Sequence, residues 1–246
     1  MSETTNTAQP HQHGAESPFS WLLKPLTTAK PEYDTFDAGY EHVRANVANE
    51  GSFDLQGLRL SAPPGVYKPG PGSSTEFCAR NRHSAGLVPS GGRLLELGCG
   101  SGALSLLAAR DGWDVTGADI EPVAVSAAQA NAALNGLNAT FKVSNMFSAF
   151  RDETFDVLLF NLPFYHKSTA QDDERTLSDV GGGLARIYFD EAHGHLRPGG
   201  RLVFSWSNCS DARLLERDDW RFEVVACDYE GLSRYWRALL VGTPLA

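Results

Sequence analysis

Residues 93–119 read RLLELGCGSGALSLLAARDGWDVTGAD, and this stretch decides the fold of the chain. An apolar run precedes a turn with three glycines, and an apolar helical pattern follows the turn. A second short apolar run then ends at Asp119. The pattern predicts a strand, a loop, a helix and a second strand that ends in an acid.

The glycine turn predicts a site for a small ligand. Glycines lack a Cβ atom, so their backbone N–H groups can approach a ligand closely. The helix that begins after Gly102 would direct its positive N-terminal end at the same place, which favours a carboxylate or a phosphate. Asp119 follows Gly98 by 21 residues, and its carboxylate can accept hydrogen bonds from a ribose diol. The ligand is therefore expected to be a nucleoside derivative.

Two nucleoside cofactors fit this spacing. Gly98, Gly100 and Ala103 satisfy the relaxed dinucleotide fingerprint of dehydrogenases. Residues 96–102 also resemble motif I of the class I S-adenosylmethionine-dependent methyltransferases, Glu/Asp-x-Gly-x-Gly-x-Gly. In that family the acid before the first glycine helps to hold the methionyl moiety, whereas dehydrogenases usually place an apolar residue there. We therefore favour S-adenosyl-L-methionine as the cofactor.

The resemblance extends the predicted cofactor contacts beyond the glycines. In this stretch they are Glu96, Gly98, Cys99, Gly100, Gly102, Asp119 and Ile120. Cys99 has a second expected role, as a small packing residue.

Composition limits the kind of protein. A chain of 246 residues can bury one large core, either as a single domain or as a core with an extension. The formal net charge of −9 argues against binding nucleic acid or anionic lipid through the overall electrostatic field, although a local basic groove is still compatible with it.

The first residues carry no targeting signal, and no apolar run reaches the roughly 18 residues of a membrane span, so we expect a cytoplasmic protein. The four cysteines lack metal-type spacing, and we expect reduced thiols and no metal site.

The chain is expected to have three parts. Residues 1–18 are polar and without periodicity, which predicts a disordered tail. Residues 19–52 carry apolar residues interrupted by Pro25 and Pro31, which predicts a short helical extension. This extension is either a lid that recognises the substrate or a helical pair that covers one sheet edge. Residues 53–246 then form the main α/β domain.

The segment ahead of the glycine turn also carries a resemblance. Residues 53–60 alternate across a glycine turn and predict a hairpin. Residues 65–77 resemble the region before motif I in the release-factor glutamine methyltransferases, which closes over the cofactor and the reacting groups. Ser74-Thr75-Glu76 stands where that group has Asp-Thr-Glu, and this implies that Thr75 contacts the cofactor. The alternative is a solvent loop in which Ser74 or Thr75 caps a helix.

A third strand leads to further cofactor contacts. Pro122 begins a predicted helix, and residues 140–144 form the next strand. The strand runs into Asn145-Met146-Phe147, where class I methyltransferases often have Asp-x-Phe. The resemblance implies that Asn145 binds the adenine amino group and that Met146 contributes to the cofactor site. Core packing is the alternative for Met146.

The fourth strand carries the predicted catalytic segment. Residues 155–160 are mostly apolar and deliver residues 161–165, NLPFY, to the carboxyl edge of the sheet, beside the cofactor. This segment resembles the Asn-Pro-Pro-Tyr signature of enzymes that methylate planar nitrogen. In those enzymes the asparagine oxygen and the next carbonyl accept the two N–H bonds, which localises the nitrogen lone pair. The aromatic residue stacks on the substrate.

The resemblance implies that Asn161, the Leu162 carbonyl and Phe164 have these roles, because they stand at the matching positions. The signature departs from the family at Leu162, so that Pro163 restrains Leu162 and leaves Asn161 without that restraint. The predicted catalytic residues are Asn161, Pro163, Phe164, Tyr165 and His166, and Asn161 is also expected to touch the cofactor. His166 is the candidate proton acceptor. The alternative is an ordinary turn at the end of a strand.

The C-terminal part separates the two cofactor hypotheses. Residues 201–206 predict a fifth strand, and residues 221–229 and 234–241 predict a closing hairpin. A dehydrogenase sheet normally continues with parallel strands, whereas the methyltransferase fold inserts an antiparallel last strand. We therefore expect an α/β fold, the Rossmann-like sheet of a class I methyltransferase, with an antiparallel C-terminal hairpin strand and a short N-terminal helical extension.

The expected activity is methyl transfer from S-adenosylmethionine to a planar nitrogen. Three acceptor classes fit: a protein glutamine, a nucleobase or a small metabolite. The acidic composition and the lack of a recognisable RNA-binding module disfavour a nucleobase, and the extension is short for a protein-recognition domain. We therefore expect a small-molecule acceptor, with nucleic acid as a disfavoured partner and no membrane partner. Methylation of a metabolite oxygen and cofactor binding without catalysis are the alternatives.

Overall fold

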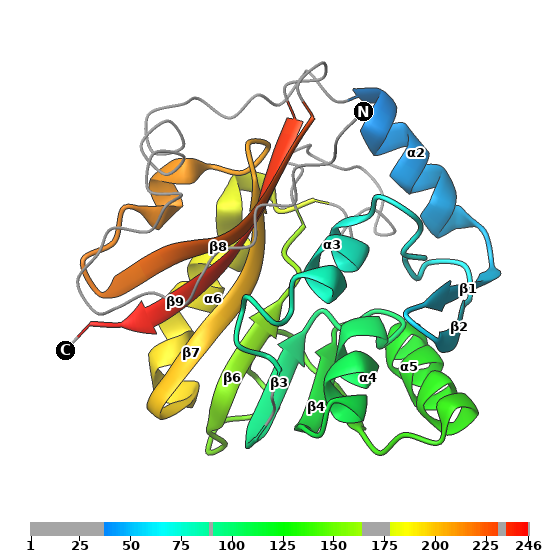
Figure 1. The fold of residues 1–246 in the computed structure, drawn as a ribbon, viewed down its shortest axis with the longest axis horizontal. Coiled ribbons are helices and arrows are strands. Elements are labelled where there is room, and N and C mark those ends of the chain that lie inside the picture. Colours follow the sequence, from blue (N-terminus) through cyan, green and yellow to red (C-terminus); the bar gives the residue numbers. More distant parts are fainter. Residues whose placement is uncertain (1–36, 89–90, 164–177, 231–234, 246) are drawn as a thin grey trace.

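The computed structural model describes residues 37–88, 91–163, 178–230 and 235–245 (Figure 1). Its elements, in chain order, are α2 (Asp37–Ala48), β1 (Gly51–Leu55), β2 (Leu58–Ala62), α3 (Ser74–Arg80), β3 (Arg93–Leu97), α4 (Ala103–Arg110), β4 (Asp114–Asp119), α5 (Pro122–Asn135), β5 (Thr140–Val143), β6 (Phe155–Phe160), η2 (Val180–Gly182), α6 (Gly183–His195), β7 (Leu196–Ser207), η3 (Ala212–Leu215), β8 (Trp220–Glu230) and β9 (Tyr235–Pro244), where η marks a short 3₁₀ turn. The predicted tail and the first part of the predicted extension lie outside the described residues. No helix in the described ranges is long and apolar enough to cross a membrane.

The described residues form a seven-stranded sheet in the order β5-β4-β3-β6-β7-β9-β8, and β1 and β2 pair separately (Figure 1). The strands β3 to β7 are parallel to one another, and β9 is antiparallel to both β7 and β8. This confirms the predicted α/β sheet with an antiparallel C-terminal hairpin. The strand order reverses beside β3, and the carboxyl ends of parallel strands at such a point form a crevice for ligands.

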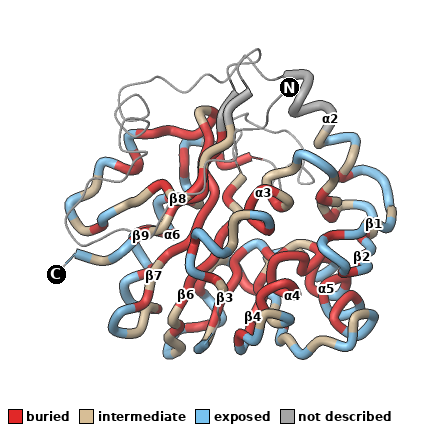
Figure 2. The backbone as a smooth tube through the Cα atoms, in the orientation of Figure 1, coloured by how far each residue is buried: buried red, intermediate tan, exposed pale blue. Residues whose placement is uncertain are grey.

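The inner strands of the sheet are buried on both faces, which explains their continuous apolar runs (Figure 2). Successive residues of a strand point to opposite faces, so Leu94 joins the core under α4 and α5, while Leu95 joins the core under α6. The core under α6 is rich in aromatic rings, such as Tyr188, Phe189 and Phe204. The sheet is therefore a rigid platform for the loops at its edges.

The strand β7 begins earlier than the sequence predicts. Leu196 pairs with Phe155 and Arg201 pairs with Val157, so four residues of β7 stand against one residue of β6. The additional residues form a bulge, which the strand pattern from residue 201 onward did not reveal. The bulge fixes which residues of β7 lie beside the carboxyl end of β6.

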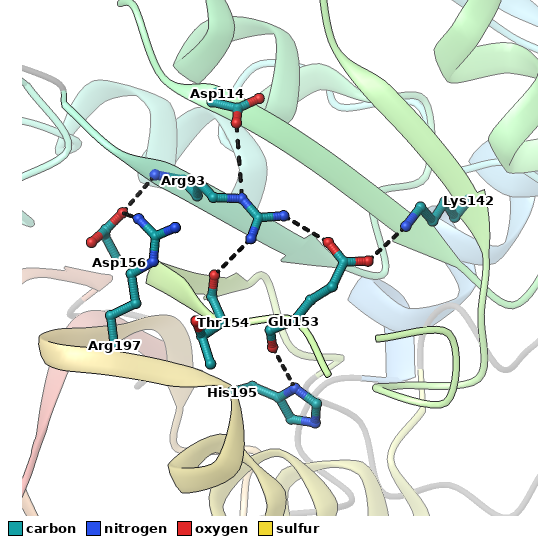
Figure 3. Close-up of polar contacts among 8 residues, drawn as sticks. All are labelled: Arg93, Asp114, Lys142, Glu153, Thr154, Asp156, His195 and Arg197. Carbon is teal, nitrogen blue, oxygen red and sulfur yellow. Dashed lines mark hydrogen bonds and ion pairs between the residues drawn. The ribbon is translucent and has the colours of Figure 1, made fainter. Parts of the chain in front are cut away.

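Ion pairs and hydrogen bonds of charged residues connect the amino-terminal ends of the parallel strands (Figure 3). The Arg93 guanidinium donates to Glu153 Oε2 at 2.6 Å, and Lys142 Nζ donates to Glu153 Oε1 at 2.8 Å. The hydrogen bonds from Lys142 and Arg93 lower the pKa of Glu153. Asp156 accepts from the Arg93 backbone N–H at 2.7 Å and pairs with Arg197 at 3.0 Å. This network stabilises the edge of the sheet opposite to the predicted site.

The helix α2 packs against the segment that leads to the predicted site. Asn46 Nδ2 donates to the Lys68 carbonyl at 3.0 Å, and the Lys68 N–H donates to Asn46 Oδ1 at 3.0 Å. Val47 is buried against Tyr67, and its carbonyl accepts from the Gly65 N–H at 2.9 Å. The C-terminal part of the predicted extension is thus helical. Its division from the main domain, and its role as lid or cover, stay predictions.

The predicted hairpin is present as β1 and β2, and α5 holds the free edge of β2. Asn131 accepts from the Ser61 N–H and donates to the Ser61 carbonyl, both at 2.9 Å, and also donates to the Ser101 carbonyl at 2.9 Å. Asn135, one helical turn on, makes the same pair of bonds with Arg59, at 3.0 and 2.8 Å. The two asparagine side chains therefore imitate a neighbouring strand. Asn131 also links the hairpin to the glycine turn.

Replacing Asn131 with alanine is expected to lower the free energy of unfolding by about 2 to 3 kcal/mol, because the buried Ser101 carbonyl and the backbone groups of Ser61 lose their partners. Asn131 is 0% exposed, whereas Asn135 is partly exposed, so water can replace the lost amide in the control variant Asn135→Ala. We expect that control to lose less than about 1 kcal/mol in urea denaturation. Equal losses would show that the hairpin is not fastened mainly through Asn131.

Candidate active site

A cavity of about 500 Å³ lies at the carboxyl ends of β3, β4 and β6. The predicted site residues that line it are Thr75, Glu96, Gly98, Cys99, Gly100, Asp119, Ile120, Asn145, Met146, Asn161 and Pro163. Gly102 lies in the same turn but behind the cavity wall. Phe164, Tyr165 and His166 lie outside the described residues, so their roles stay predictions. The cavity therefore brings most predicted cofactor contacts together with Asn161 and Pro163.

The glycine turn needs glycine for two different reasons. Gly98 and Gly102 have φ angles of 60° and 80°, and an added Cβ atom would lie 2.9 Å from Phe160 Cε2 at Gly98 and 2.9 Å from Ala128 Cβ at Gly102. Gly102 thus allows α4 to pack closely against α5. Gly100 has a φ angle of 52°, and nothing lies within 4 Å of the position of its Cβ. At Gly100 the backbone is therefore open to a ligand in the cavity.

Glu96 is a buried acid in the cavity wall. It is 2% exposed, and the Ser105 hydroxyl donates to its Oε2. Burial raises the pKa of the Glu96 carboxyl to about 8, the Ser105 hydrogen bond lowers it in part, and the nearby charge of Asp119 raises it further. A cationic group of a ligand would favour the ionised form of Glu96.

Asp119 shapes the glycine turn and keeps acceptor capacity for a ligand. Its Oδ2 accepts from the Gly100 N–H at 2.8 Å, and its Oδ1 accepts from the Glu121 N–H at 3.0 Å. Burial raises the pKa of Asp119, while these backbone hydrogen bonds lower it. A carboxylate oxygen can accept more than one hydrogen bond, so both oxygens can serve a ribose diol as well.

The cysteines of the chain are free thiols. Cys99 is 5% exposed at the cavity wall, and burial raises the pKa of its thiol. Cys99 therefore packs as a small neutral residue, which is the second role expected for it.

The charges of the cavity distinguish the two cofactor hypotheses. Its acids are Glu96, Asp119, Glu121 and Asp179, and no described residue of its wall is Lys, Arg or His. Such a cavity suits S-adenosylmethionine, whose sulfonium and ammonium groups are cations, better than a dinucleotide with its anionic pyrophosphate. The residues present therefore fit S-adenosylmethionine.

The predicted adenine contacts lie on an unusual turn after β5. Met146 has a φ angle of 47°, a left-handed conformation that is uncommon for a residue with a side chain. Ser144 Oγ donates to the Met146 carbonyl at 2.7 Å and accepts from the Ala149 N–H at 3.1 Å, which holds this turn. Asn145 is exposed at the cavity wall, and Met146 is half-buried against the core. Met146 thus combines core packing with a place in the site.

The amide of Asn161 lies between two elements. Its Oδ1 accepts from Ser205 Oγ of β7 at 2.8 Å, and its Nδ2 donates to Thr75 Oγ1 at 3.1 Å and Ser74 Oγ at 3.3 Å, in the first turn of α3. The N-cap of α3 is Ser73, whose hydroxyl accepts from a backbone N–H of that turn. Neither Ser74 nor Thr75 therefore takes the capping role considered above. Thr75 lies at the cavity wall and contacts the predicted catalytic asparagine.

Several further residues of the cavity wall were not among the predicted site residues. They include Tyr67, Ser178, Asp179, Leu184 and Ile187. Asp179 stabilises the start of α6, because its carboxylate accepts from the Leu184 and Ala185 N–H groups at 2.8 and 3.0 Å. An acid shortly before a run of three glycines and a helical pattern is a helix-start signal, so the sequence did contain evidence for Asp179.

Comparison with known proteins establishes the family. Residues 71–226 match the methyltransferase small domain family. The chain belongs to this family. The match confirms the predicted resemblance to S-adenosylmethionine-dependent methyltransferases, and with it S-adenosylmethionine as the cofactor.

Two curated relatives of this methyltransferase small domain chain show how far the similarity extends. The ribosomal RNA small subunit methyltransferase C of Hamiltonella defensa is 32% identical over 176 residues, which are 70% of this chain and 48% of that protein. The release factor glutamine methyltransferase of Koribacter versatilis is 30% identical over 157 residues, which are 57% of this chain and 56% of that protein. The chain therefore spans about half the length of these relatives.

A solved structure shares the fold. The 16S rRNA N2 methyltransferase of T. thermophilus, in complex with AdoMet and guanosine, aligns with a TM-score of 0.59. The identity is 23%, and the alignment covers 78% of this chain and 49% of that one. The likeness supports the arrangement of the sheet and its antiparallel hairpin.

The relatives overturn the expectation of a small-molecule acceptor. Their names give ribosomal RNA, a release factor and ribosomal protein L11 as the molecules that they modify. The expectation rested on the net charge of −9, on the lack of a recognisable RNA-binding module and on the short extension. It was wrong because a net charge averages over the whole surface and does not report which acceptor one cavity takes.

Proposed function

We propose that this chain transfers a methyl group from S-adenosylmethionine to an exocyclic amino nitrogen of a nucleobase in RNA. The observation that carries the proposal is that Asn161 lines the same cavity as the carboxyls of Glu96 and Asp119. A cofactor held by the two acids would lie next to an amide that suits a planar nitrogen. Relatives named for the methylation of ribosomal RNA support the choice of a nucleobase. A ribosomal acceptor also agrees with the cytoplasmic location predicted from the sequence.

The residues of the cavity suit the separate parts of the cofactor. S-adenosylmethionine supplies, when bound, an electrophilic methyl group on a sulfonium. Asp119 would accept hydrogen bonds from the ribose hydroxyls, and Glu96 would face the ammonium group. The amide oxygen of Asn145 would accept from the adenine amino group. The glycine turn would leave room for these contacts.

Asn161 would orient the acceptor nitrogen. The lone pair of an exocyclic amino group is delocalised into the ring, so this nitrogen is a poor nucleophile. The Asn161 oxygen and the Leu162 carbonyl can each accept one N–H, which turns the lone pair toward the methyl group. Alignment of two reactants can lower a barrier by about 7 kcal/mol or more. The proton can leave after transfer, so the proposal requires no strong base.

A glutamine amide in a protein is the second candidate acceptor. Thr75 contacts Asn161 in the segment that resembles the release-factor glutamine methyltransferases. The nitrogen of a glutamine amide is also planar, so the same two acceptor oxygens would serve it. A relative of 30% identity carries this activity in its name.

Transfer of tritiated methyl groups tests the proposal. We expect the wild-type chain to label deproteinised bacterial ribosomal RNA, and the label to appear in an amino-methylated nucleoside after digestion. Asp119→Ala should bind S-adenosylhomocysteine about 10 to 100 times more weakly in calorimetric titration, because hydrogen bonds to a carboxylate are lost. Asp114→Ala, at the opposite end of β4, is the control and should bind normally. Label in a purified release factor alone would favour the glutamine amide, and label in neither acceptor would contradict both candidates.

A further inference from the structure

Three hydroxyl groups surround the amide of Asn161. Ser205 lies on β7 and is 1% exposed, and Thr75 lies on α3 and is 5% exposed. Their oxygens lie 2.8 Å from Oδ1 and 3.1 Å from Nδ2 of Asn161, and Ser74 Oγ lies 3.3 Å from Nδ2. The oxygen end of the amide is thus held by the sheet, and the nitrogen end by a helix.

The thiol of Cys78 also lies at the oxygen end of the amide. Cys78 Sγ lies 4.0 Å from Asn161 Oδ1. Burial raises the pKa of Cys78 to about 12, so Cys78 is a thiol at neutral pH and can only act as a weak donor to this oxygen. A carbonyl oxygen has two lone pairs, of which the Ser205 hydroxyl occupies one. The weak thiol contact leaves the other lone pair available to an acceptor N–H.

We infer that Ser205 and Thr75 are positioning residues, which hold the Asn161 amide in the orientation that an acceptor N–H must meet. The inference rests on the proposed function of Asn161 and goes beyond it. The terminal torsion of an asparagine is broad, so an unanchored amide samples many orientations. Anchoring both its oxygen and its nitrogen removes this rotation before the substrate binds.

The strand β9 connects α3 and β7, the two elements that hold the Asn161 amide. Arg237 on β9 donates through Nη1 to the Gly72 carbonyl, next to Ser73, which caps α3. The Arg237 guanidinium also lies 5.0 Å from the ring centre of Phe77 in α3. The strand β9 pairs with β7 along the stretch that contains Ser205. These contacts keep α3 and β7 at a fixed spacing on either side of the amide.

Side-chain NMR of the nitrogen-15-labelled chain tests the anchoring without any turnover. We expect the NH₂ signals of Asn161, assigned by their loss in Asn161→Ala, to exchange with water slowly. Ser205→Ala and Thr75→Val each remove one hydroxyl, and each should speed this exchange by about tenfold. Thr75→Ser keeps the hydroxyl and should restore slow exchange.

Ser207→Ala is the matched control for Ser205→Ala. Ser207 lies two residues further along β7, on the same face, and is 0% exposed. Its hydroxyl accepts from the Cys209 N–H at 3.1 Å. Its removal therefore deletes a buried hydroxyl of the same strand and should leave the Asn161 signals unchanged.

A double-mutant cycle tests whether the anchoring serves catalysis. With the RNA that the wild-type chain labels, Ser205→Ala should lower kcat by about tenfold, while the affinity for S-adenosylhomocysteine stays the same. In the Asn161→Ala background, Ser205→Ala should not lower kcat any further, because a positioning residue acts only through the residue that it holds. Ser207→Ala should leave kcat unchanged.

Two results would overturn the inference. One is unchanged Asn161 signals in both Ser205→Ala and Thr75→Val, and the other is an additive loss of kcat in the cycle. Failure of the proposed function gives a different result, in which the wild-type chain labels neither acceptor although the Asn161 signals respond to both variants. That result would refute the function and confirm the anchoring.

Discussion

Asn161→Ala is expected to lower kcat by a factor of about 100 to 1,000, while the affinity for S-adenosylhomocysteine stays within about threefold of the wild-type value. The acceptor nitrogen would lose an oriented hydrogen-bond acceptor, whereas Glu96 and Asp119 would still hold the cofactor. Single-turnover transfer of labelled methyl groups measures the first quantity, and calorimetric titration measures the second. A loss of cofactor affinity with unchanged kcat would contradict the role of Asn161.

Asn145→Ala is the matched control for this variant, because it removes an asparagine from another part of the same cavity. We expect it to weaken cofactor binding by about threefold to tenfold and to affect kcat far less. Asn161→Ala also leaves the Ser205 hydroxyl without its partner, so the free energy of unfolding should fall by about 1 to 2 kcal/mol. Urea denaturation measures this loss, and assays below the unfolding transition keep it separate from kcat.

The sequence was sufficient to predict the cavity because its main residues follow directly on strands. The predicted strand 155–160 agrees with β6, since a run that is buried on both faces stands out from its polar neighbours. Gly98 follows β3, Asp119 ends β4 and Asn161 follows β6. The carboxyl ends of neighbouring parallel strands meet at one edge, so these side chains could be placed together without knowledge of the loops.

The contact between Ser205 and Asn161 could not be predicted in this way. It joins residues 44 positions apart, and it depends on the register of β7 against β6. Phe160 pairs with Phe204, so Asn161 comes to lie beside Ser205 only because of the bulge near the start of β7. A strand pattern gives the alternation of faces but not the register. The expectation of a small-molecule acceptor failed for another reason, because composition describes the whole chain, whereas one site chooses the acceptor.

Glu96→Gln is expected to remove a pH dependence of stability. Burial raises the pKa of Glu96 from 4.5 to about 8. Between these pH values the folded chain keeps a proton that the unfolded chain releases, so the free energy of unfolding falls as the pH rises and levels off above about pH 8. The full difference in the free energy of unfolding corresponds to about 5 kcal/mol. The raised pKa of Asp119 acts in the same direction, whereas the lowered pKa values of Glu153 and Asp219 act only in more acidic solution.

Glutamine does not ionise, and its oxygen can still accept from the Ser105 hydroxyl. We therefore expect the wild-type chain to lose about 4 kcal/mol between about pH 5 and pH 8.5, and Glu96→Gln to lose less than about 1 kcal/mol. Ser105→Ala is a second variant, which should extend the pH dependence of stability and not remove it. It removes the hydrogen bond that lowers the pKa of Glu96, so its loss of stability should continue to higher pH. Urea denaturation at a series of pH values measures all three curves.

The stability that Glu96→Gln gains at alkaline pH should be accompanied by weaker cofactor binding. A neutral amide cannot pair with the ammonium group that the ionised Glu96 would face, so the buried acid is retained for binding although it destabilises the ligand-free chain. If the free energy of unfolding depended on pH in the same way for the wild-type chain and for Glu96→Gln, Glu96 would ionise in the folded chain near its ordinary pKa. In that case water would already solvate the carboxylate, and Glu96 would lack the dry surroundings that make it a strong site for a cation.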